Sequence, residues 1–344
     1  MEFDLIARIR IRARARAGRR EDVELGIGDD AAVLRVPDGM RLVVTTDTLN
    51  AGVHFPAATA AADIGWKALA VNLSDLAAMA ARPAWCTLSL SLPRADTDWI
   101  DGFLDGFLAL AAQHGVALVG GDTTRGSLSV CVTAHGLVEP GRALRRDGAR
   151  VGDDVWVTGS LGDAAGALAL PASAESTGDA ADASAWLRLR LDRPQPRLAA
   201  GAALAGIAHA CIDVSDGLLA DLGHVCAASR VGAEVRIDAL PASDALCERF
   251  AGDARRELQA AGGDDYELCF TAPPDARDAV ARVGFEADVA VTRIGRIVAG
   301  DGVRARDGGG RTWRPRRAGY AHFADPEASL SHRDVVENAG APSE

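Results

Sequence analysis

Apolar residues recur with a regular period in several stretches of the chain, and these stretches predict both helices and strands. From Trp99 onward the apolar positions are 99, 100, 103, 104, 107, 108 and 111, which is the spacing of one helical face. Asp98 is a suitable N-cap for this helix, and Gly115 is a suitable end. Residues 63–81 are alanine-rich and apolar nearly all round, so they predict a second helix that is buried on every side.

Short apolar runs predict strands around these helices, and the same mixture recurs in the second half. The first half has predicted strands at 41–49, 85–93, 116–124 and 128–138. The second half has predicted strands at 154–159, 233–238 and 288–298, helices at 161–170 and 273–285, a strand-turn-helix at 211–229 and a turn-strand at 262–271. Two mixed halves of similar size predict two α+β domains.

The charged, turn-rich segment 139–154 separates the two halves. We therefore place an N-terminal domain at 1–148 and a C-terminal domain at 149–323, followed by a disordered tail at 324–344 that has little apolar content. Residues 171–185 are small and polar, which predicts a flexible surface insertion. The arginine-rich stretch 8–20 is expected to be a surface element.

Composition excludes several functional classes. The formal net charge of −11 argues against nucleic acid and anionic membranes as partners, and no apolar run is long enough to span a membrane. The six cysteines are scattered without a C-x-x-C pair, which favours reduced thiols in a cytoplasmic protein. Lys67 is the only lysine, and no serine or threonine follows it, so the chain has no Walker P-loop. A pyridoxal enzyme is disfavoured too, because no motif supports Lys67 in that role.

Aspartates stand at the ends of apolar elements throughout the chain. A single aspartate at such a place is most simply a turn or N-cap residue. Asp75 differs, because with Asn72 it forms an i, i+3 polar pair inside the apolar helix, and a buried carboxylate needs a partner. Together the aspartates predict a carboxylate cage that holds several Mg²⁺ ions, which in turn bind the phosphates of a nucleotide. The members are Asp29, Asp30, Asp47, Asp75, Asp122, Asp213, Asp216, Asp264 and Asp265.

Residues 26–31 formally match the dinucleotide-binding pattern G-x-G-x-x-A. That pattern must open a helix, whereas the residues that follow, 31–36, have strand character. We therefore reject a Rossmann site here.

These acidic motifs, in this order, resemble the thiamine-monophosphate kinase family over nearly the whole chain to about Phe323. The resemblance rests on ELGIGDDAAVL, TTDTLNAGVHF, GWKALAVNLSDLAAMAA, LVGGDTTRG, GRALRRDGARVGDDVWVTGSLGDAAG, IDVSDGLLADLGH and GGDDYELCFT. It implies the two-domain α+β fold of aminoimidazole ribonucleotide synthetase, with helices packed on mixed or antiparallel sheets. It also implies a homodimer that is formed through the N-terminal domain, and the conversion of ATP and thiamine phosphate into ADP and thiamine diphosphate.

The resemblance assigns roles to individual residues. The implied Mg²⁺ ligands are Asp30, Thr45, Thr46, Asp47, Asp75, Asp122, Asp213 and Asp216. The implied ATP contacts are Gly121, Asp122, Arg146 and Ser215, and the implied thiamine phosphate contacts are His54, Asp264 and Tyr320. Asp264 stands where the family usually has glutamate, so its reach is one methylene shorter. Trp313 is a second candidate for the aromatic contact.

The acceptor of this reaction is a phosphate monoester, whose second pKa is about 6, so it is already largely anionic at pH 7. We therefore expect no side chain to act as an essential base. Two alternatives stay open: another ATP-dependent enzyme of the same superfamily, and a noncatalytic protein that binds divalent metals. The absence of an EF-hand spacing disfavours the second alternative.

Overall fold

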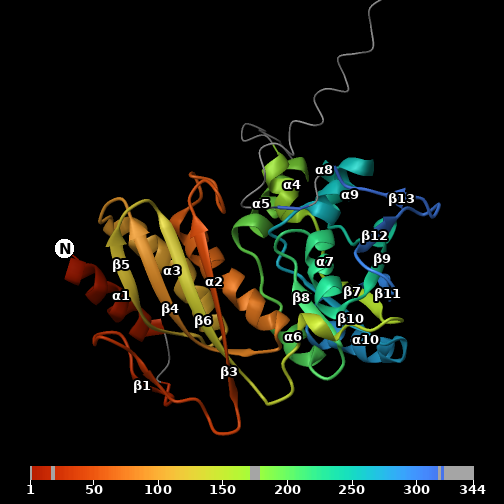
Figure 1. Cartoon of the computed structure of the whole chain (residues 1–344). Coiled ribbons are helices and arrows are strands. Elements are labelled where there is room, and N and C mark those ends of the chain that lie inside the picture. Colours follow the sequence, from red (N-terminus) through yellow and green to blue (C-terminus); the bar gives the residue numbers. More distant parts are fainter. Residues whose placement is uncertain (1, 17–19, 171–178, 317–318, 321–344) are drawn as a thin grey trace, which may run out of the picture.

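The computed structural model describes residues 2–16, 20–170, 179–316 and 319–320, and its elements form two lobes (Figure 1). The predicted tail 324–344 lies outside the described residues. The elements of the N-terminal lobe are α1 (Glu2–Arg16), β1 (Val23–Leu25), β2 (Val33–Leu34), β3 (Arg41–Asn50), α2 (Ala61–Ala78), β4 (Arg82–Leu92), α3 (Thr97–Gln113), β5 (Ala117–Arg125) and β6 (Ser129–Val138).

The N-terminal lobe is built on a four-stranded sheet with the order β3-β6-β4-β5. β6 pairs antiparallel with both β3 and β4, whereas β5 runs parallel to β4. Helices α2 and α3 cover one face, where Leu69, Phe103 and Val132 belong to one core cluster. This arrangement leaves β3 and β5 as the two edges of the sheet.

The C-terminal lobe begins after Val138 with a short 3₁₀ turn, η1 (Arg146–Gly148). Its further elements are β7 (Asp154–Thr158), α4 (Asp163–Ala169), α5 (Asp179–Asp192), α6 (Leu198–Leu204), β8 (Ala210–Asp213), α7 (Leu218–Ser229), β9 (Gly232–Arg236), η2 (Ile237–Ala239), α8 (Asp244–Arg249), α9 (Gly252–Ala261), β10 (Leu268–Ala272), η3 (Pro274–Ala276), α10 (Arg277–Glu286), β11 (Val291–Val298), β12 (Val303–Arg306) and β13 (Thr312–Trp313).

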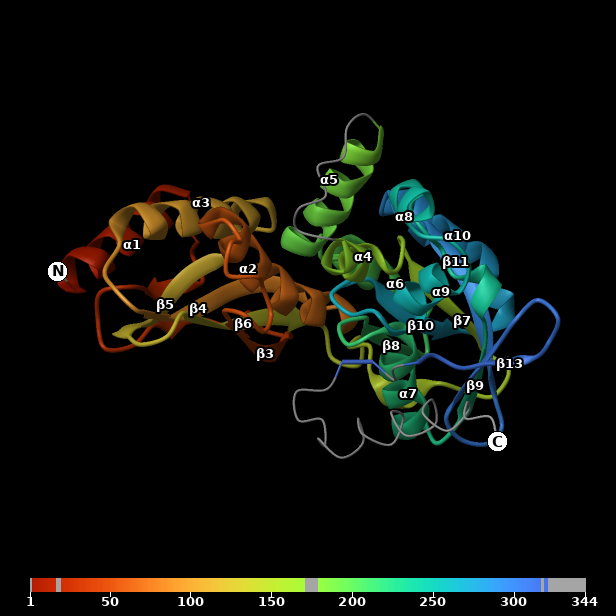
Figure 2. The ribbon, with the colours of Figure 1, turned by 90° about the horizontal axis from the view of Figure 1, so that it is seen from above.

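Helices cover both faces of the seven-stranded sheet, whose order is β13-β12-β9-β11-β7-β10-β8. On one face, Val155 and Ile212 cluster with residues of α7. On the other face, Phe270 clusters with α6, α10 and the last residues of α2. The two mixed sheets with helices on their faces confirm the predicted α+β class, and the end of α2 joins the lobes (Figure 2).

Two local expectations need correction, and a third gains detail. α3 begins two residues earlier than its pattern predicted, because Asp96 rather than Asp98 is the N-cap and accepts a hydrogen bond from the Trp99 N–H. The predicted flexible insertion 171–185 is partly helical, since α5 starts at Asp179, while 171–178 lie outside the described residues. The arginine-rich stretch is a surface element as expected and forms most of α1, with Arg8, Arg14 and Arg16 exposed and Ile9 and Ala13 buried.

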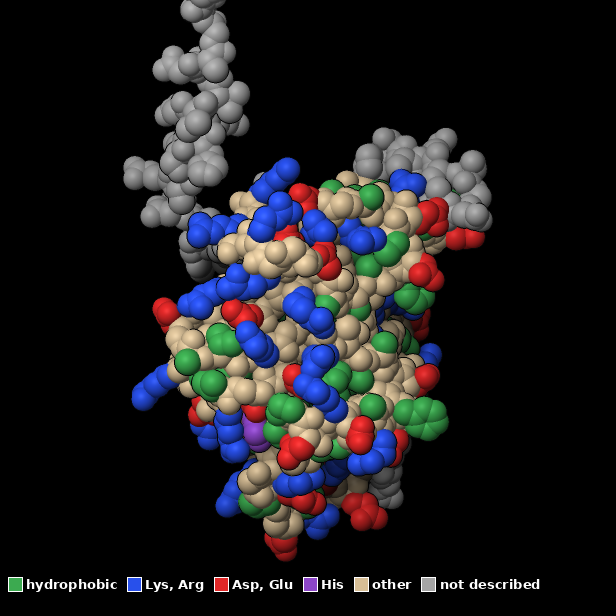
Figure 3. All heavy atoms as spheres, turned by 90° about the vertical axis from the view of Figure 1, so that its right-hand side faces the viewer, with side chains coloured by type: hydrophobic (Ala, Val, Ile, Leu, Met, Phe, Trp, Pro, Cys, Tyr) green, Lys and Arg blue, Asp and Glu red, His purple; other side chains and the backbone are tan. Residues whose placement is uncertain are grey.

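Charged side chains of both signs share the surface at the far end of the C-terminal lobe (Figure 3). Ion pairs hold several arginines of this lobe, including Arg296 with Glu234 and Arg277 with Asp154. Within the described residues, no helix is long and apolar enough to cross a membrane.

Close packing between α2 and α3 depends on glycine. A Cβ at Gly106 would overlap the carbonyl oxygen of Ala62, whereas a Cβ at Gly102 would make an ordinary contact 3.4 Å from the Ala61 Cβ. The two helices therefore approach each other most closely at Gly106.

Gly106→Ala is predicted to lower the free energy of unfolding by about 1–3 kcal/mol, because the added methyl group forces the helices apart. The matched variant Gly102→Ala on the same helix is expected to be neutral or stabilising by up to about 1 kcal/mol. Urea unfolding of both variants measures the difference. Equal stability of the two variants would contradict the packing argument.

Candidate active site

A cleft of about 770 Å³ lies where the two lobes meet. The N-terminal lobe contributes the end of β3, the turn after it and one side of α2. The C-terminal lobe contributes α4, the β8–α7 turn and the segment before β10. Of the predicted site residues, the cleft is lined by Thr46, Asp47, His54, Asp75, Asp213, Ser215, Asp216, Asp264 and Tyr320. The structure thus brings residues from both halves of the sequence to one place.

A second cavity of about 420 Å³ adjoins this cleft. It is lined by Thr45 from β3, by Met79 at the end of α2 and by Arg146 in η1. Asp75 and Asp213 line both cavities, so these two carboxylates stand between them. The arrangement offers two neighbouring binding spaces with negative charge at their junction.

The carboxylates at this junction are held in a partly desolvated space. Burial raises the pKa of Asp47 to about 6, and the negative charge of Asp75 raises it further in the same direction. Burial also raises the pKa of Asp213 to about 8, again with Asp75 as the strongest neighbouring charge. Hydroxyl groups support two of them: Thr45 Oγ1 donates to Asp75 Oδ2, and Ser74 Oγ donates to Asp213 Oδ2 over 2.8 Å.

These oxygen donors suit a hard divalent cation. Within the described part of the chain, no three His, Cys, Asp or Glu side chains are close enough together to hold an ion by themselves. Mg²⁺ needs no such cage, since it is usually bound by one or two carboxylates, with waters and substrate phosphates as its other ligands. Pairs drawn from Asp47, Asp75 and Asp213 fit that pattern, and a cation beside them would offset the burial that raises the pKa of each and the repulsion that adds to it at Asp47 and Asp213.

The β8–α7 turn is shaped by a buried carboxylate behind it. Asp221 Oδ2 accepts hydrogen bonds from the backbone N–H groups of Ser215, Asp216 and Gly217, at 3.0, 3.1 and 3.1 Å. Burial raises the pKa of Asp221 to about 7, and the charge of Asp216 adds to this effect. Asp221 thereby fixes the turn that presents Ser215 and Asp216 to the cleft.

The segment before β10 alternates between the cleft and the interior. Asp264 and Tyr266 line the cleft, and both adopt positive φ angles, 69° and 51°. The Tyr266 hydroxyl donates to Asp264 Oδ1 over 3.0 Å, and Lys67 Nζ lies 3.0 Å from Asp264 Oδ2. Left-handed backbone is unfavourable for non-glycine residues, so the surrounding contacts must hold the segment in this form.

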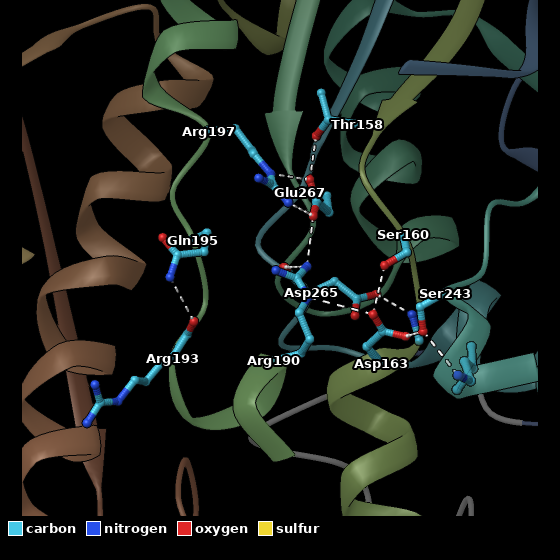
Figure 4. Close-up of polar contacts among 12 residues, drawn as sticks. Thr158, Ser160, Asp163, Arg190, Arg193, Gln195, Arg197, Ser243, Asp265 and Glu267 are labelled. Carbon is cyan, nitrogen blue, oxygen red and sulfur yellow. Dashed lines mark hydrogen bonds and ion pairs between the residues drawn. The ribbon is translucent and has the colours of Figure 1, made fainter. Parts of the chain in front are cut away.

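Buried ionic contacts behind the segment supply that support (Figure 4). The Glu267 carboxylate, which is fully buried, pairs with the guanidinium groups of Arg190 and Arg197 and accepts a hydrogen bond from Thr158. Asp265 Oδ2 accepts a hydrogen bond from the Gly162 N–H over 2.7 Å, and burial raises the pKa of Asp265 well above its usual range. The back of the segment is therefore anchored in the core of the lobe.

The remaining predicted site residues line neither the cleft nor the second cavity of the same chain. Asp30 occupies an exposed turn between β1 and β2, and it lines neither cavity. Gly121 and Asp122 line a separate small pocket of about 80 Å³ on β5, together with Ile9 of α1. Trp313 is partly buried and packs against the core of the C-terminal lobe, so of the two aromatic candidates Tyr320 is the one that lines the cleft.

The sheet itself separates Asp122 from the cleft. One row across the sheet runs from Thr48 through Cys131 and Ser89 to Asp122. Three strand spacings of about 4.8 Å put β3 and β5 roughly 14 Å apart. A Mg²⁺–oxygen bond is only about 2.1 Å long, so Asp122 of the same chain cannot share an ion with Asp47.

Several supporting residues were not identified from the sequence as site residues: Lys67, Asp221, Glu267, Arg190 and Arg197. Lys67 and Asp221 each place a charge in an apolar helix, which is a signal that sequence reasoning can detect. No local pattern marks Arg190 and Arg197, because their partner Glu267 is at least 70 residues away in sequence.

Comparisons with known proteins agree with this architecture. The family model described as AIR synthase related protein, N-terminal domain, matches residues 28–138, and the corresponding C-terminal domain model matches residues 150–308. The thiamine-monophosphate kinase of Salmonella typhimurium is 46% identical over 329 residues, which cover 94% of this chain and 99% of that protein.

Solved structures of thiamine-monophosphate kinases also match this chain. The crystal structure of thiamine-monophosphate kinase from Stenotrophomonas maltophilia is 58% identical with a TM-score of 0.81, covering 88% of this chain and 96% of that one. The structure described as AaThiL complexed with AMPPCP and TMP is 32% identical with a TM-score of 0.73, covering 84% of this chain and 89% of that one. The chain therefore belongs to the thiamine-monophosphate kinases, a family of ATP-dependent enzymes built from the two AIR synthase related domains.

Proposed function

We propose that the chain transfers the terminal phosphoryl group of ATP directly and in line to thiamine phosphate, with Mg²⁺ present, and so forms ADP and thiamine diphosphate. The observation that carries this proposal is the pair of adjoining cavities with Asp75 and Asp213 between them. A nucleotide fits the smaller cavity, where Arg146 offers a guanidinium group to its phosphates. Thiamine phosphate fits the larger cleft, beside His54, Asp264 and Tyr320. The description of AaThiL as complexed with AMPPCP and TMP supports a nucleotide and thiamine phosphate as the two ligands.

The chain's own residues position the two substrates and need not supply a base. The acceptor phosphate is already anionic near neutral pH, since its second pKa is about 6. His54 Nδ1 accepts a hydrogen bond from the Asn50 N–H over 2.9 Å, so that nitrogen is engaged in shaping the turn. Pairs among Asp47, Asp75 and Asp213 would hold Mg²⁺, which would supply charge neutralisation between the two phosphate groups.

We also propose a homodimer in which the partner subunit completes the metal site. Both edges of the N-terminal sheet, β3 and β5, are long, and a long open edge is a template for pairing with another chain. The sheet face away from α2 and α3 carries partly exposed side chains, including Thr46, Ser89 and Thr133, that another sheet can cover. Pairing β3 with the partner's β5 brings the partner's Asp122 toward Asp47.

The domain boundary at 148 and 149 and a cytoplasmic location belong to the same proposal. The boundary falls between the last strand of the first sheet and the first strand of the second, Val138 and Asp154. All six cysteines are free, as expected in a reducing compartment.

The first experiment tests the reaction itself. The purified protein is incubated with ATP and thiamine phosphate, with and without Mg²⁺, and the products are separated by chromatography. We expect thiamine diphosphate only when Mg²⁺ is present, and none when free thiamine replaces thiamine phosphate. ATP binding without any product would retain the fold assignment and reject the acceptor.

Asp47→Asn is predicted to lower kcat/KM by at least about ten- to hundredfold, because it removes a metal-binding charge. The same change is expected to leave the metal-free protein as stable as the parent or more stable at pH 8. Folding raises the pKa of Asp47 to about 6 from 3.8, so its ionisation above that pH disfavours the folded state, and asparagine removes this cost.

Thermal unfolding across pH measures this stability difference, which should shrink as the pH falls from 6 toward 4. Asp38→Asn, at an exposed loop position, is the control and is expected to change neither property. Normal turnover of Asp47→Asn at ordinary Mg²⁺ concentration would reject Asp47 as a metal ligand.

If both subunits contribute residues to each metal site, two inactive variants should complement each other in a mixed dimer. Asp47→Asn and Asp122→Asn are co-expressed with different tags, and the mixed dimer is purified. If each site takes Asp47 from one subunit and Asp122 from the other, one of the two sites in the mixed dimer is intact, and activity returns. A mixed dimer as inactive as its parents would place both residues in one chain's site.

A further inference from the structure

Lys67 is the only lysine among the 37 basic residues of the chain, and its place in the fold is unusual. Its side chain is only 3% exposed, and its Nζ lies 3.0 Å from Asp264 Oδ2. Lys67 belongs to α2 in the N-terminal lobe, whereas Asp264 precedes β10 in the C-terminal lobe. This ion pair, in which Lys67 is buried and Asp264 is partly exposed, therefore joins the two lobes at the wall of the cleft.

We propose that Lys67 is a positioning residue for thiamine phosphate: it orients the Asp264 carboxylate toward the substrate and neutralises its charge. This inference rests on the proposed function, because it assigns Asp264 to the recognition of thiamine phosphate. Lys67 itself does not line the cleft, so it acts through Asp264.

One face of α2 connects this ion pair to the reacting end of the cleft. Lys67, Val71 and Asp75 follow one another at i, i+4 and i+8, so they lie on one side of the helix. Val71 and Asp75 line the cleft, and Asp75 is one of the proposed metal ligands. Eight residues of helix span about 12 Å, so the helix sets the distance between the Asp264 end and the metal end. Thiamine phosphate also has two ends, an aminopyrimidine ring and a phosphate group.

Contacts from three directions fix Asp264. Its backbone N–H donates to the Ser215 carbonyl oxygen over 2.9 Å, Tyr266 donates to Oδ1, and Lys67 holds Oδ2. A carboxylate oxygen can accept more than one hydrogen bond, so each oxygen keeps accepting capacity for a ligand. The two contacts already made fix the orientation of the carboxylate, and so they fix the direction from which a ligand can donate a hydrogen bond. Loss of the Lys67 ammonium would release one of them and leave the carboxylate free to rotate about its side-chain bonds.

The charge of the cleft also favours a lysine beside Asp264. The cleft already contains Asp47, Asp75, Asp213 and Asp216, and its proposed ligand carries an anionic phosphate. With Lys67 beside it, Asp264 contributes an acceptor without adding net negative charge. Lysine also fits a nearly sealed position better than arginine, because an ammonium has three donors to satisfy and a guanidinium has five.

A double-mutant cycle tests the proposal, with Lys67→Met, Asp264→Asn and the combined variant. Lys67→Met is expected to raise the KM for thiamine phosphate about ten- to hundredfold, the loss typical of a charged hydrogen bond, while kcat and the KM for ATP stay unchanged. The combined variant is expected to match Asp264→Asn alone, because Lys67 acts only through Asp264. Calorimetric titration with thiamine phosphate in the absence of ATP should show the same order of affinities.

Arg193→Met is the matched control, since Arg193 pairs with Asp63 on the same helix, one turn before Lys67, and lines no part of the cleft. It is expected to leave the KM for thiamine phosphate unchanged. Lys67→Arg keeps the charge and carries the test if Lys67→Met does not fold, as judged by thermal unfolding. It should raise this KM above that of the parent but by less than Asp264→Asn does, and a fall in kcat alone would contradict the proposal.

The outcomes distinguish a failure of the proposed reaction from a failure of the role proposed for Lys67. If the parent protein forms no thiamine diphosphate, the proposed function fails. If the parent is active but the Lys67 and Asp264 effects simply add, or kcat and both KM values change together, Lys67 only holds the lobes together and the proposal is overturned.

Discussion

The structure depends on negative charges that are held together at the junction of two lobes. Asp47, Asp75 and Asp213 come from a strand edge, a buried helix and a second sheet, and burial raises the pKa of each. Such a cluster opposes folding when it is ionised, unless a cation binds beside it. The lobes therefore meet at a place where binding of a cation and its phosphate ligands lowers the energy of the folded chain.

Helix α2 makes this junction rigid. It is buried along most of its length, and its last residues pack against the C-terminal lobe. Glycines permit the close approach on both sides: a Cβ at Gly106 of α3 would overlap Ala62, and one at Gly201 of α6 would overlap the Ala77 carbonyl oxygen. Interiors packed this closely transmit small displacements. The position of Asp75 relative to Asp264 is thus set by helix packing as well as by local contacts.

Sequence patterns predicted the elements whose signals are local. α2, α3 and the four strands of the first sheet appear within a few residues of their expected bounds, because each has a long run with one period. α1 was missed, since the alternation of arginine with apolar residues hides the i, i+4 spacing of Leu5, Ile9 and Ala13. The placement of Asp122 depends on strand order, which no local pattern encodes, and so do the contacts of Arg190 and Arg197 with Glu267.

In the segment before β10, the residues that line the cleft carry the backbone strain, and other residues stabilise the segment. Asp264 and Tyr266 adopt left-handed backbone, which costs of order 1–3 kcal/mol at each residue. Glu267 and its two arginines lie on the opposite side of the segment and do not line the cleft, so they can stabilise it without contact with a ligand. Because successive residues alternate between these sides, each inward contact limits the freedom of an outward side chain. Strain at the cleft is therefore maintained by interactions that a substrate never reaches.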